Sequence, residues 1–367
     1  MVTNGAQGDF SPAGSASPGN AALSIQALLD GDLRSAAAVQ PLLGPFSILL
    51  RVPFAGVADL LGGDEVVKYQ AGAFACLLGP VALGIHLGDR MAGKGAGLIA
   101  RLVLALLCVV NPMTLESLAI GHPEEPLAAA LVAGAVLVAT DRPRWAGGLL
   151  GLALATKQWA LVAAPVVVVA ARRGRVALVL IAAVVGAALL VPATLADRAA
   201  ADAVRDAVLD SHLVSLLSAW WPISEDAPGG GSARLLPLGA TRAALAPALF
   251  VLSAGLAVAL WRRVPRVDAE RALALLALVL MLRCALDPAT LQYYTVGPML
   301  AVCAWEAMAR PGLPLIALLY AATSWVAYGP LLDNQGDTMI SVVYLTLVAL
   351  FAALMARAAF APVGSRA

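Results

Sequence analysis

Residues 111–125 read NPMTLESLAIGHPEE and lie between two almost entirely apolar runs, 96–110 and 127–140. The stretch contains His122 and three carboxylates, of which Glu124 and Glu125 come directly before the second run. Ionisable groups at the end of a membrane helix cost free energy unless they meet water, a partner or a substrate. The stretch therefore predicts two membrane helices joined by a functional site, and a plain polar turn at the membrane surface is the alternative.

The composition of the whole chain indicates a membrane protein. Of its 367 residues, 61% are hydrophobic and only 13% are charged, whereas soluble proteins carry roughly 25% charged residues. Most apolar runs have about 20 residues, the length at which a helix crosses a hydrocarbon core about 30 Å thick. We predict an all-α, polytopic transmembrane bundle of about 10–11 helices. The net charge of +1 does not suggest a nucleic-acid partner.

The chain is predicted to have two parts. An extracytoplasmic N-terminal segment, 1–66, includes a helix at 41–61 that lies in the membrane interface, and a helical domain, 67–367, includes a polar outer loop at 197–237. The membrane helices are expected at 69–88, 97–115, 124–140, 145–157, 158–171, 176–196, 238–261, 269–286, 291–308, 312–330 and 338–360. The pair 145–157 and 158–171 is too short for two full spans. It is predicted to be one kinked helix or a re-entrant hairpin with Lys157 at its tip.

Basic residues gather in the loops on one side of the predicted bundle. They are Arg90, Lys94, Arg142, Arg144, Arg172, Arg173, Arg175, Arg262, Arg263, Arg266, Arg310 and Arg357. If 145–171 is a hairpin, all of them fall on one side, and the positive-inside rule makes that side the cytoplasm. These loops are too short for βαβ nucleotide-binding units, and no convincing strand precedes a glycine-rich loop. An activated substrate would therefore come through the lipid or from outside.

The N-terminal segment would begin on the outer face with nothing to carry it there, because it has no signal-peptide pattern. We therefore expect that a first transmembrane helix upstream of Met1 is missing, and the alternative is that residues 45–62 span. The alanine-rich, lysine-poor composition is typical of a GC-rich bacterial genome. A multi-pass protein of a bacterial plasma membrane, with its active face outside the cytoplasm, is predicted.

Two motifs on the predicted outer side are candidates for chemistry. His122, Glu124 and Glu125 could bind a divalent cation, Mg²⁺ or Mn²⁺, or act as an acid–base set, although sites with three or four well-placed ligands are the rule for metals. Lys157 lies in the middle of an apolar stretch, where a buried ammonium needs a counter-ion. A lipid phosphate would supply one, and snorkelling of Lys157 to the interface is the alternative.

A second polar set follows the helix at 269–286. It consists of Arg283, Asp287, Gln292, Tyr293 and Tyr294. Paired tyrosines are typical of an interfacial aromatic belt, and we expect that role unless the set converges with His122 in space. The stretch 199–217 with Trp220 and Trp221 is similarly expected to be an interfacial helix with belt tryptophans, or a sugar-stacking surface.

The segment GHPEE at 121–125 and the run WAGGLLGLALATKQW at 145–159, after a polar outer segment, resemble the GT-C superfamily of integral membrane glycosyltransferases. They are most similar to the actinobacterial family 87 type, which uses polyprenyl-phosphate mannose. The resemblance covers roughly residues 20–310 and implies a GT-C-like fold, an inverting transfer at the outer membrane face and no soluble cofactor. The implied partners are the polyprenyl-phosphate sugar donor, a lipid or glycan acceptor and membrane lipids.

The resemblance also implies roles for particular residues. Asp32, among the N-terminal candidates Asp9, Asp30 and Asp32, would deprotonate the acceptor hydroxyl, and Lys157 would meet the lipid phosphate. We therefore expect the catalytic residues Asp32, Glu124 and Glu125 and the substrate-binding residues His122, Lys157, Gln158, Asp287, Tyr293 and Tyr294. Because the expected first helix is absent, a catalytically inactive relative that serves as a partner subunit is an alternative function.

A membrane transporter or flippase is the alternative from a different class. Transporters often show internal repeats and helices that are broken near the middle of the membrane. No convincing repeat relates the two halves of this chain, and its polar residues gather at one face, which favours an enzyme.

Overall fold

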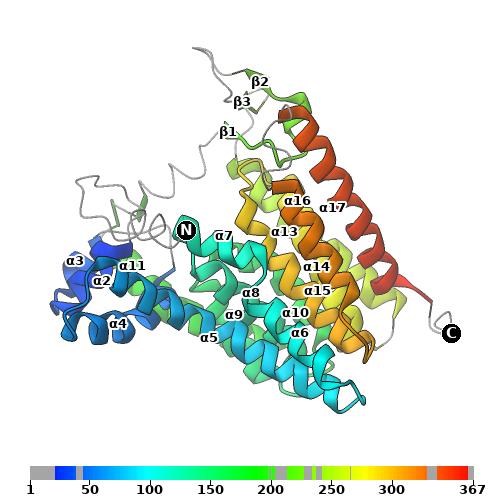
Figure 1. The fold of residues 1–367 in the computed structure, drawn as a ribbon, viewed down its shortest axis with the longest axis horizontal. Coiled ribbons are helices and arrows are strands. Elements are labelled where there is room, and N and C mark those ends of the chain that lie inside the picture. The colour runs from blue at the N-terminus through cyan, green and yellow to red at the C-terminus, as the bar shows by residue number, and fades with distance from the viewer. Residues whose placement is uncertain are drawn as a thin grey trace.

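In the computed structural model the chain is a bundle of α-helices with a small three-stranded sheet at one end (Figure 1). The structure describes residues 21–38, 44–196, 198–199, 201–202, 213–226, 234–236, 242–264, 266–328 and 337–362. Among these residues, five segments are long and apolar enough to cross a membrane: Val66–Ala92, Leu98–Ile120, Arg175–Ala196, Leu245–Arg263 and Asp337–Phe360. The predicted all-α polytopic bundle is confirmed, with several of its helices shorter than a full span.

The elements follow one another along the chain as follows. They are α2 (Ala21–Leu29), α3 (Leu33–Ala38), α4 (Pro45–Leu60), α5 (Glu65–Ala92), α6 (Leu98–Val109), α7 (Pro112–Ile120), α8 (Glu124–Ala139), α9 (Pro143–Leu154), the 3₁₀ helix η1 (Gln158–Ala163), α10 (Ala164–Ala170), α11 (Arg175–Ala196), β1 (Leu213–Val214), η2 (Trp221–Ile223), β2 (Glu225–Asp226), β3 (Arg234–Leu235), α13 (Arg242–Arg263), α14 (Ala269–Leu286), η4 (Gln292–Thr295), α15 (Val296–Ala309), α16 (Leu315–Tyr328) and α17 (Asp337–Phe360).

The predicted helix at 97–115 is divided into α6 and α7. Pro112 has no backbone N–H and occupies the first turn of α7, where none is needed. The Asn111 side chain caps α7 by accepting the Thr114 N–H at 2.9 Å. Gly121 ends α7 with a φ of 95°, a left-handed conformation that favours glycine. The polar stretch of the sequence is thus a short helix and a turn, and α8 begins at Glu124.

Residues 143–171 form a hairpin of two short helices. A Cβ on Gly174 would lie 2.9 Å from Pro143, and one on Gly147 would lie 2.5 Å from the Leu178 carbonyl oxygen. The starts of α9 and α11 are therefore neighbours, and η1 with α10 returns the chain from the tip to that end. The predicted hairpin with Lys157 at its tip is confirmed, and the kinked helix is wrong. The 12 residues of α9 rise about 18 Å, less than the roughly 30 Å of a hydrocarbon core.

The basic loops meet at one end of the bundle. Contacts join Lys94 with Ala307, Arg175 with Trp261, and Arg263 with Phe360. The close approach of Gly174 to Pro143 brings the α8–α9 and α10–α11 connections to the same end. The common position that the sequence predicts for these loops is confirmed, whereas the side of the membrane that they face stays a prediction.

The outer loop contains the three short strands, in the order β1–β3–β2. The predicted interfacial helix at 199–217 is wrong at its end, because Leu213–Val214 pairs with Arg234–Leu235 of β3 instead; residues 200 and 203–212 lie outside the described part. The sequence shows no strand pattern in this loop, and each of the three strands has only two residues. The indole N–H of Trp220 donates to the Leu286 carbonyl at 2.7 Å. This loop therefore packs on the C-terminal end of α14.

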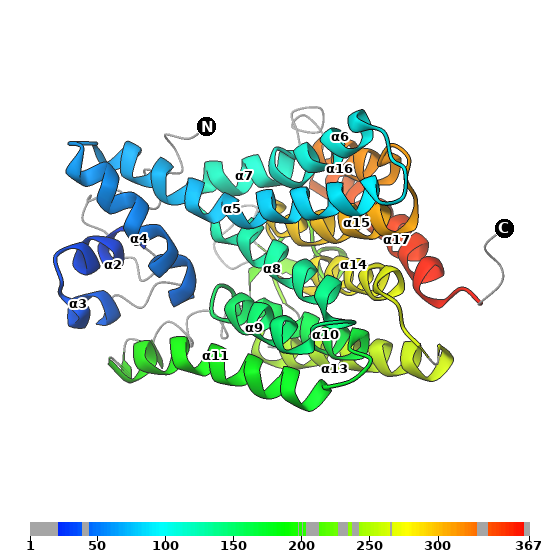
Figure 2. The same cartoon turned by 90° about the horizontal axis from the view of Figure 1, so that it is seen from below.

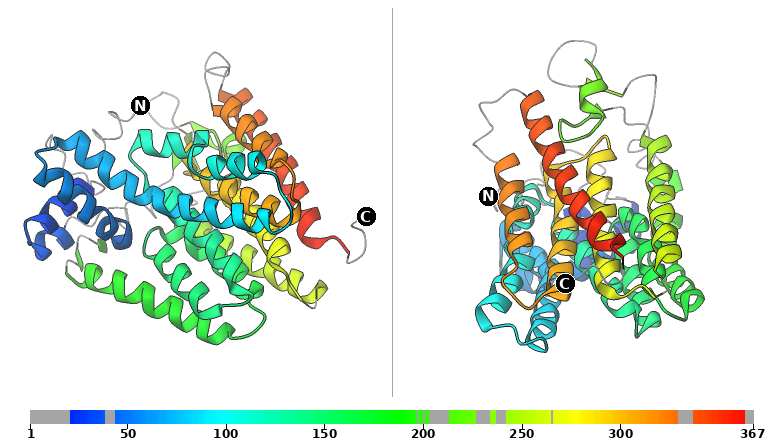
Figure 3. Two further views of the ribbon diagram at one scale, coloured as in Figure 1. Left: turned by 60° about the horizontal axis from the view of Figure 1, so that its bottom comes forward. Right: turned by 90° about the vertical axis from the view of Figure 1, so that its right-hand side faces the viewer.

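Helices α14 and α15 form the centre of the bundle, with buried apolar residues around their whole circumference. Helices α2 to α4 form an arm on one side, remote from α17 (Figures 2 and 3). The arm has its own apolar cluster, which includes Ile25 and Ile48 together with Tyr69 at the start of α5. The predicted division at residue 66 falls in this region and stays a prediction.

Candidate functional site

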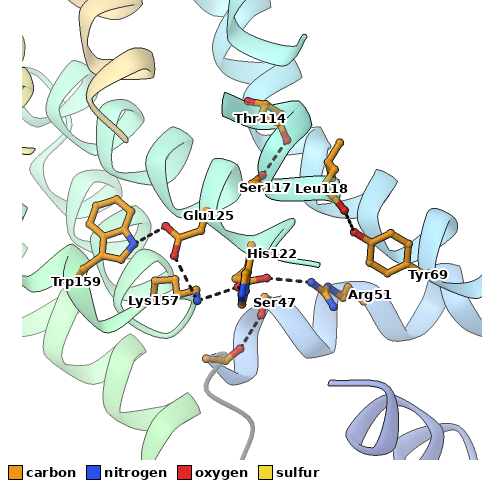
Figure 4. A network of polar contacts seen from close by, with 12 residues as sticks. Ser47, Arg51, Tyr69, Thr114, Ser117, Leu118, His122, Glu125, Lys157 and Trp159 are labelled. Carbon is orange, nitrogen blue, oxygen red and sulfur yellow. Dashed lines mark hydrogen bonds and ion pairs between the residues drawn. The ribbon is translucent and has the colours of Figure 1, made fainter. Parts of the chain in front are cut away.

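Three separate elements bring four charged residues together. Glu124 and Glu125 come from the first turn of α8. Arg51 comes from α4 and Lys157 from the hairpin tip, and both point toward the start of α8 (Figure 4). Lys157 Nζ lies 2.9 Å from Glu124 Oε1 and 3.3 Å from Glu125 Oε1. Arg51 Nη2 lies 3.1 Å from Glu124 Oε2. We call Arg51, Glu124, Glu125 and Lys157 the charged cluster.

Local backbone contacts hold α4 against the hairpin tip. The Gly44 N–H donates to the Thr156 carbonyl at 2.9 Å, and the Phe46 N–H donates to the Ala155 carbonyl at 3.0 Å. A Cβ on Gly44 would lie 2.0 Å from the Ala155 carbonyl oxygen, so the approach requires glycine. Because α4 begins at this anchor, the position of Arg51 depends on it.

The charged cluster is buried but internally paired. The Glu124 side chain has no exposed surface, and those of Arg51 and Lys157 are 1% and 13% exposed. Buried charges are costly unless they have partners, and the positive end of the α8 dipole adds a favourable term for the two glutamates. Lys157 has counter-ions within the chain, so it does not need a lipid phosphate to be buried. Its contact with a phosphate stays a prediction.

His122 extends the cluster toward solvent. Its Nδ1 lies 2.9 Å from Glu124 Oε1, and its side chain is 28% exposed. An ionised carboxylate only accepts hydrogen bonds, so Nδ1 carries the hydrogen and Nε2 of the neutral ring is an acceptor. A histidine oriented in this way by a carboxylate can take a proton from a bound hydroxyl.

The second polar set of the sequence converges with His122. The ring of Tyr293 stacks on the His122 ring at 4.7 Å between centroids, and Tyr294 meets Tyr293 edge-on at 5.0 Å. The Arg283 guanidinium lies 4.4 Å from the Tyr294 ring and 5.0 Å from the Trp159 ring. The sequence predicts an aromatic belt for these residues unless they converge with His122, and they do converge with it.

Three predicted site residues lie apart from this convergence. Asp32 is exposed and caps α3, with one oxygen 3.0 Å from the Ser35 N–H and the other 2.6 Å from the Ser35 hydroxyl, and these bonds lower the Asp32 pKa. Gln158 is exposed at the start of η1. Asp287 accepts the Ala289 N–H at 3.1 Å and closes the turn after α14. Asp9 lies outside the described residues. No contact among the described residues joins Asp32 to the charged cluster, and its role as the base stays a prediction.

The charged cluster as arranged does not fit a divalent cation. Both oxygens of Glu124 contact cationic groups, and Glu125 uses one oxygen for Lys157 and the other for the Trp159 indole N–H at 2.9 Å. In the part of the chain that the structure describes, no three His, Cys, Asp or Glu side chains are placed to hold a metal ion. The predicted Mg²⁺ or Mn²⁺ site would need these pairs to open.

Comparison with known proteins identifies the family. The model of glycosyltransferase family 87 matches residues 42–288. The chain belongs to glycosyltransferase family 87. Among solved structures it is similar to ArnT from Cupriavidus metallidurans, crystallised with undecaprenyl phosphate, at 14% identity and a TM-score of 0.48 over 98% of this chain and 75% of that one. No curated protein sequence matches it.

The family 87 match includes the whole charged cluster and Arg283. The resemblance stated from GHPEE and the glycine-rich run is therefore confirmed at the level of the family. Asp32, Tyr293 and Tyr294 lie outside the matched residues. A cavity of about 690 Å³ between α4 and α5 is lined by apolar side chains such as Phe54 and Phe74 and does not include the charged cluster.

Two residues of the site were missed from the sequence of this family 87 member. Arg51 was assigned to an interfacial helix, although an arginine between Leu50 and Val52 in an apolar run was a signal for a buried partner. Trp159 ends the glycine-rich run at 145–159, and its indole connects Glu125 to Arg283. No local pattern indicates either contact, because both partners lie on other helices.

Proposed function

We propose that this family 87 glycosyltransferase moves a sugar, mannose, from a polyprenyl-phosphate donor to a lipid or glycan acceptor at the charged cluster. The observation that carries the proposal is the pairing of Lys157 with Glu124 and Glu125 beside the solvent-facing His122. A lipid-linked donor fits the short connections at 93–97, 140–142, 171–174 and 310–314, which leave no room for a βαβ nucleotide-binding unit.

The proposed reaction assigns a task to each group. The acceptor oxygen forms a bond to the sugar C1, the bond from C1 to the phosphate oxygen breaks, and polyprenyl phosphate leaves. Cationic side chains stabilise the charge that grows on the leaving phosphate. The acceptor proton goes to a base, for which His122 Nε2, oriented by Glu124, is our proposal. Asp32, implied by the resemblance, is the second candidate for this base.

A transporter is less consistent with the described core. Residues 126–139 of α8, 272–282 of α14 and 296–305 of α15 contain no charged side chain. These segments separate the charged cluster from the basic loops at the other end. A transport path would need polar groups that continue between the two ends, so the arrangement favours an enzyme with a site at one end.

The basic end gives the proposed orientation. Lys and Arg are enriched in short cytoplasmic loops, so the loops joined by Lys94, Arg175 and Arg263 would face the cytoplasm of a bacterial cell. The charged cluster would then face the outer side of the plasma membrane, where a polyprenyl-phosphate donor presents its sugar.

The test is a transfer assay with membranes from cells that make the chain and labelled polyprenyl-phosphate mannose. We expect a labelled lipid or glycan, and a nearly complete loss of it in Lys157→Ala. Lys94→Ala is the matched control, because Lys94 caps carbonyls at the opposite end, and it should retain transfer. Label transferred only from another polyprenyl-phosphate sugar would overturn mannose, and no transfer from any such donor would overturn the proposed enzyme.

A further inference from the structure

Arg283 on the last turn of α14 is a buried cation that has no acidic partner among the residues described. Arg283 as a whole is 4% exposed. Its guanidinium lies between the rings of Trp159 and Tyr294, at 5.0 and 4.4 Å from their centroids. Within the described part of the chain, Arg283 forms no side-chain hydrogen bond or ion pair, in contrast to Arg51 and Lys157. Aromatic faces attract a guanidinium, but they do not neutralise its charge.

The surroundings of Arg283 connect it to the rest of the site. Trp159 presents its face to Arg283 while its indole N–H donates to Glu125. Tyr294 contacts Arg283 and meets the edge of Tyr293, which stacks on His122. Arg283 is therefore separated by one ring from the charged cluster, and by two rings from His122.

The charged cluster is internally balanced, whereas Arg283 is not paired with an acid among the described residues; Asp287, the nearest acid in the sequence, closes the turn after α14. Arg51 and Lys157 balance Glu124 and Glu125, to which they are paired, and Arg283 adds one positive charge. A glycosyl phosphodiester carries one negative charge on its phosphate. The donor phosphate would supply the negative charge that no described side chain gives to Arg283, whereas the Lys157 ammonium already contacts two carboxylates.

We propose that Arg283 binds the phosphate of the lipid-linked donor. This inference rests on the proposed function and assigns to Arg283 the contact that the sequence predicted for Lys157. The planar guanidinium can donate two parallel N–H bonds to phosphate oxygens, and the two rings hold the plane in place. A lysine could supply the charge but neither the fork of donors nor the stacking.

In the transfer step, Arg283 acts on the leaving group. As the bond from the sugar C1 to the phosphate oxygen breaks, the electron pair stays on that oxygen, and the guanidinium stabilises the added charge. The acceptor oxygen forms the new bond to C1, and its proton goes to the base. No oxidant, reductant or further reactant is needed.

The test measures discrimination between a charged and an uncharged ligand, and it does not depend on transfer. Purified protein in detergent is heated with polyprenyl phosphate, with the matching polyprenol or with inorganic phosphate, and the midpoint of unfolding is followed. For the unsubstituted chain we expect polyprenyl phosphate to bind about tenfold or more tightly than polyprenol. Arg283→Met should remove that preference and leave polyprenol binding unchanged.

A matched control comes from the same helix. Arg271 at the start of α14 is also 4% exposed, and Arg271→Met should keep the preference for the phosphate. If Arg283→Met does not fold, Arg283→Lys replaces it, with an expected partial loss of the preference.

Three results would overturn the assignment. They are an undiminished preference in a folded Arg283 variant, equal loss in Arg271→Met, and stabilisation by inorganic phosphate as strong as that by polyprenyl phosphate. Failure of the proposed function would look different, because the phosphate preference would persist while no donor supports transfer.

Discussion

Glu124→Gln is the substitution that tests the charged cluster most directly. Glutamine keeps the volume of the side chain and removes its charge, so packing is nearly unchanged. Glu124 has no exposed surface and contacts both Arg51 and Lys157. Its loss therefore removes the Glu124 contact from two buried cations, of which Lys157 keeps its contact with Glu125.

The magnitude follows from the burial of the pair. Removing one partner of a buried ion pair costs about 3–5 kcal/mol. The entropy of unfolding is about 2.1 cal/mol/K per residue, which gives about 0.77 kcal/mol/K for 367 residues. The midpoint of thermal unfolding should therefore fall by about 4–7 °C.

The assay is the loss of the monodisperse peak in size-exclusion chromatography after heating of the detergent-solubilised protein. Glu116→Gln is the matched control: Glu116 lies in the same polar stretch, is half-buried and forms no ion pair among the described residues. Its midpoint should stay within about 1 °C of the unsubstituted chain, as surface changes do. Equal midpoints for the two variants would refute the claim that Glu124 holds the cluster together.

Three further outcomes are expected. Gly44→Ala should lower the unfolding midpoint and transfer together, because the added Cβ would lie 2.0 Å from the Ala155 oxygen, whereas Gly148→Ala, with nothing within 4 Å, should change neither. Asp32→Asn should keep the cap of α3, since asparagine caps as well as aspartate, so a loss of transfer would support the base role and retained transfer would end it. The Ser35 hydrogen bonds lower the Asp32 pKa, so the carboxylate stays ionised, and its contribution to stability persists, until the pH falls below its usual titration range. Transfer should survive chelation by EDTA, because the carboxylate oxygens of the charged cluster are already engaged; a loss that Mg²⁺ or Mn²⁺ reverses would restore the metal hypothesis.

Much of the site was predictable from local pattern. His122, Glu124 and Glu125 stand out because charged residues are rare in such apolar surroundings, and Lys157 stands out for the same reason. The hairpin followed from two runs too short to span, and it placed Lys157 on the same side as His122. These arguments need only the length of a helix and the cost of a charge, and both are read from one segment at a time.

The remaining features depend on contacts between distant segments. Arg51 meets Glu124 across 73 positions of the chain, and hydrophobic periodicity gives no information about such a partner. The short strands arise from pairing of Leu213 with Leu235, where two-residue segments carry no alternating pattern. The break between α6 and α7 was predictable, because Asn111 and Pro112 form a start signal for a helix, but a long apolar run concealed it.

The two arginines of the site have different expected roles: Arg51 stabilises the fold, and Arg283 binds a ligand. Arg51 connects α4 to α8 through Glu124, so its loss leaves an acid with one fewer partner and weakens the attachment of the arm. Arg283 is not paired with an acid in the described part of the chain, and the rings beside it keep their own contacts with Glu125 and Tyr293. Substituting Arg51 should therefore lower the unfolding midpoint even without ligand. Substituting Arg283 should remove an uncompensated buried charge, leave that midpoint equal or higher, and show its effect only when a phosphate is present. The described acids of the charged cluster are already paired, and Arg283 lies between two aromatic rings without an acid among the described residues, an arrangement suited to holding an anion from outside the chain.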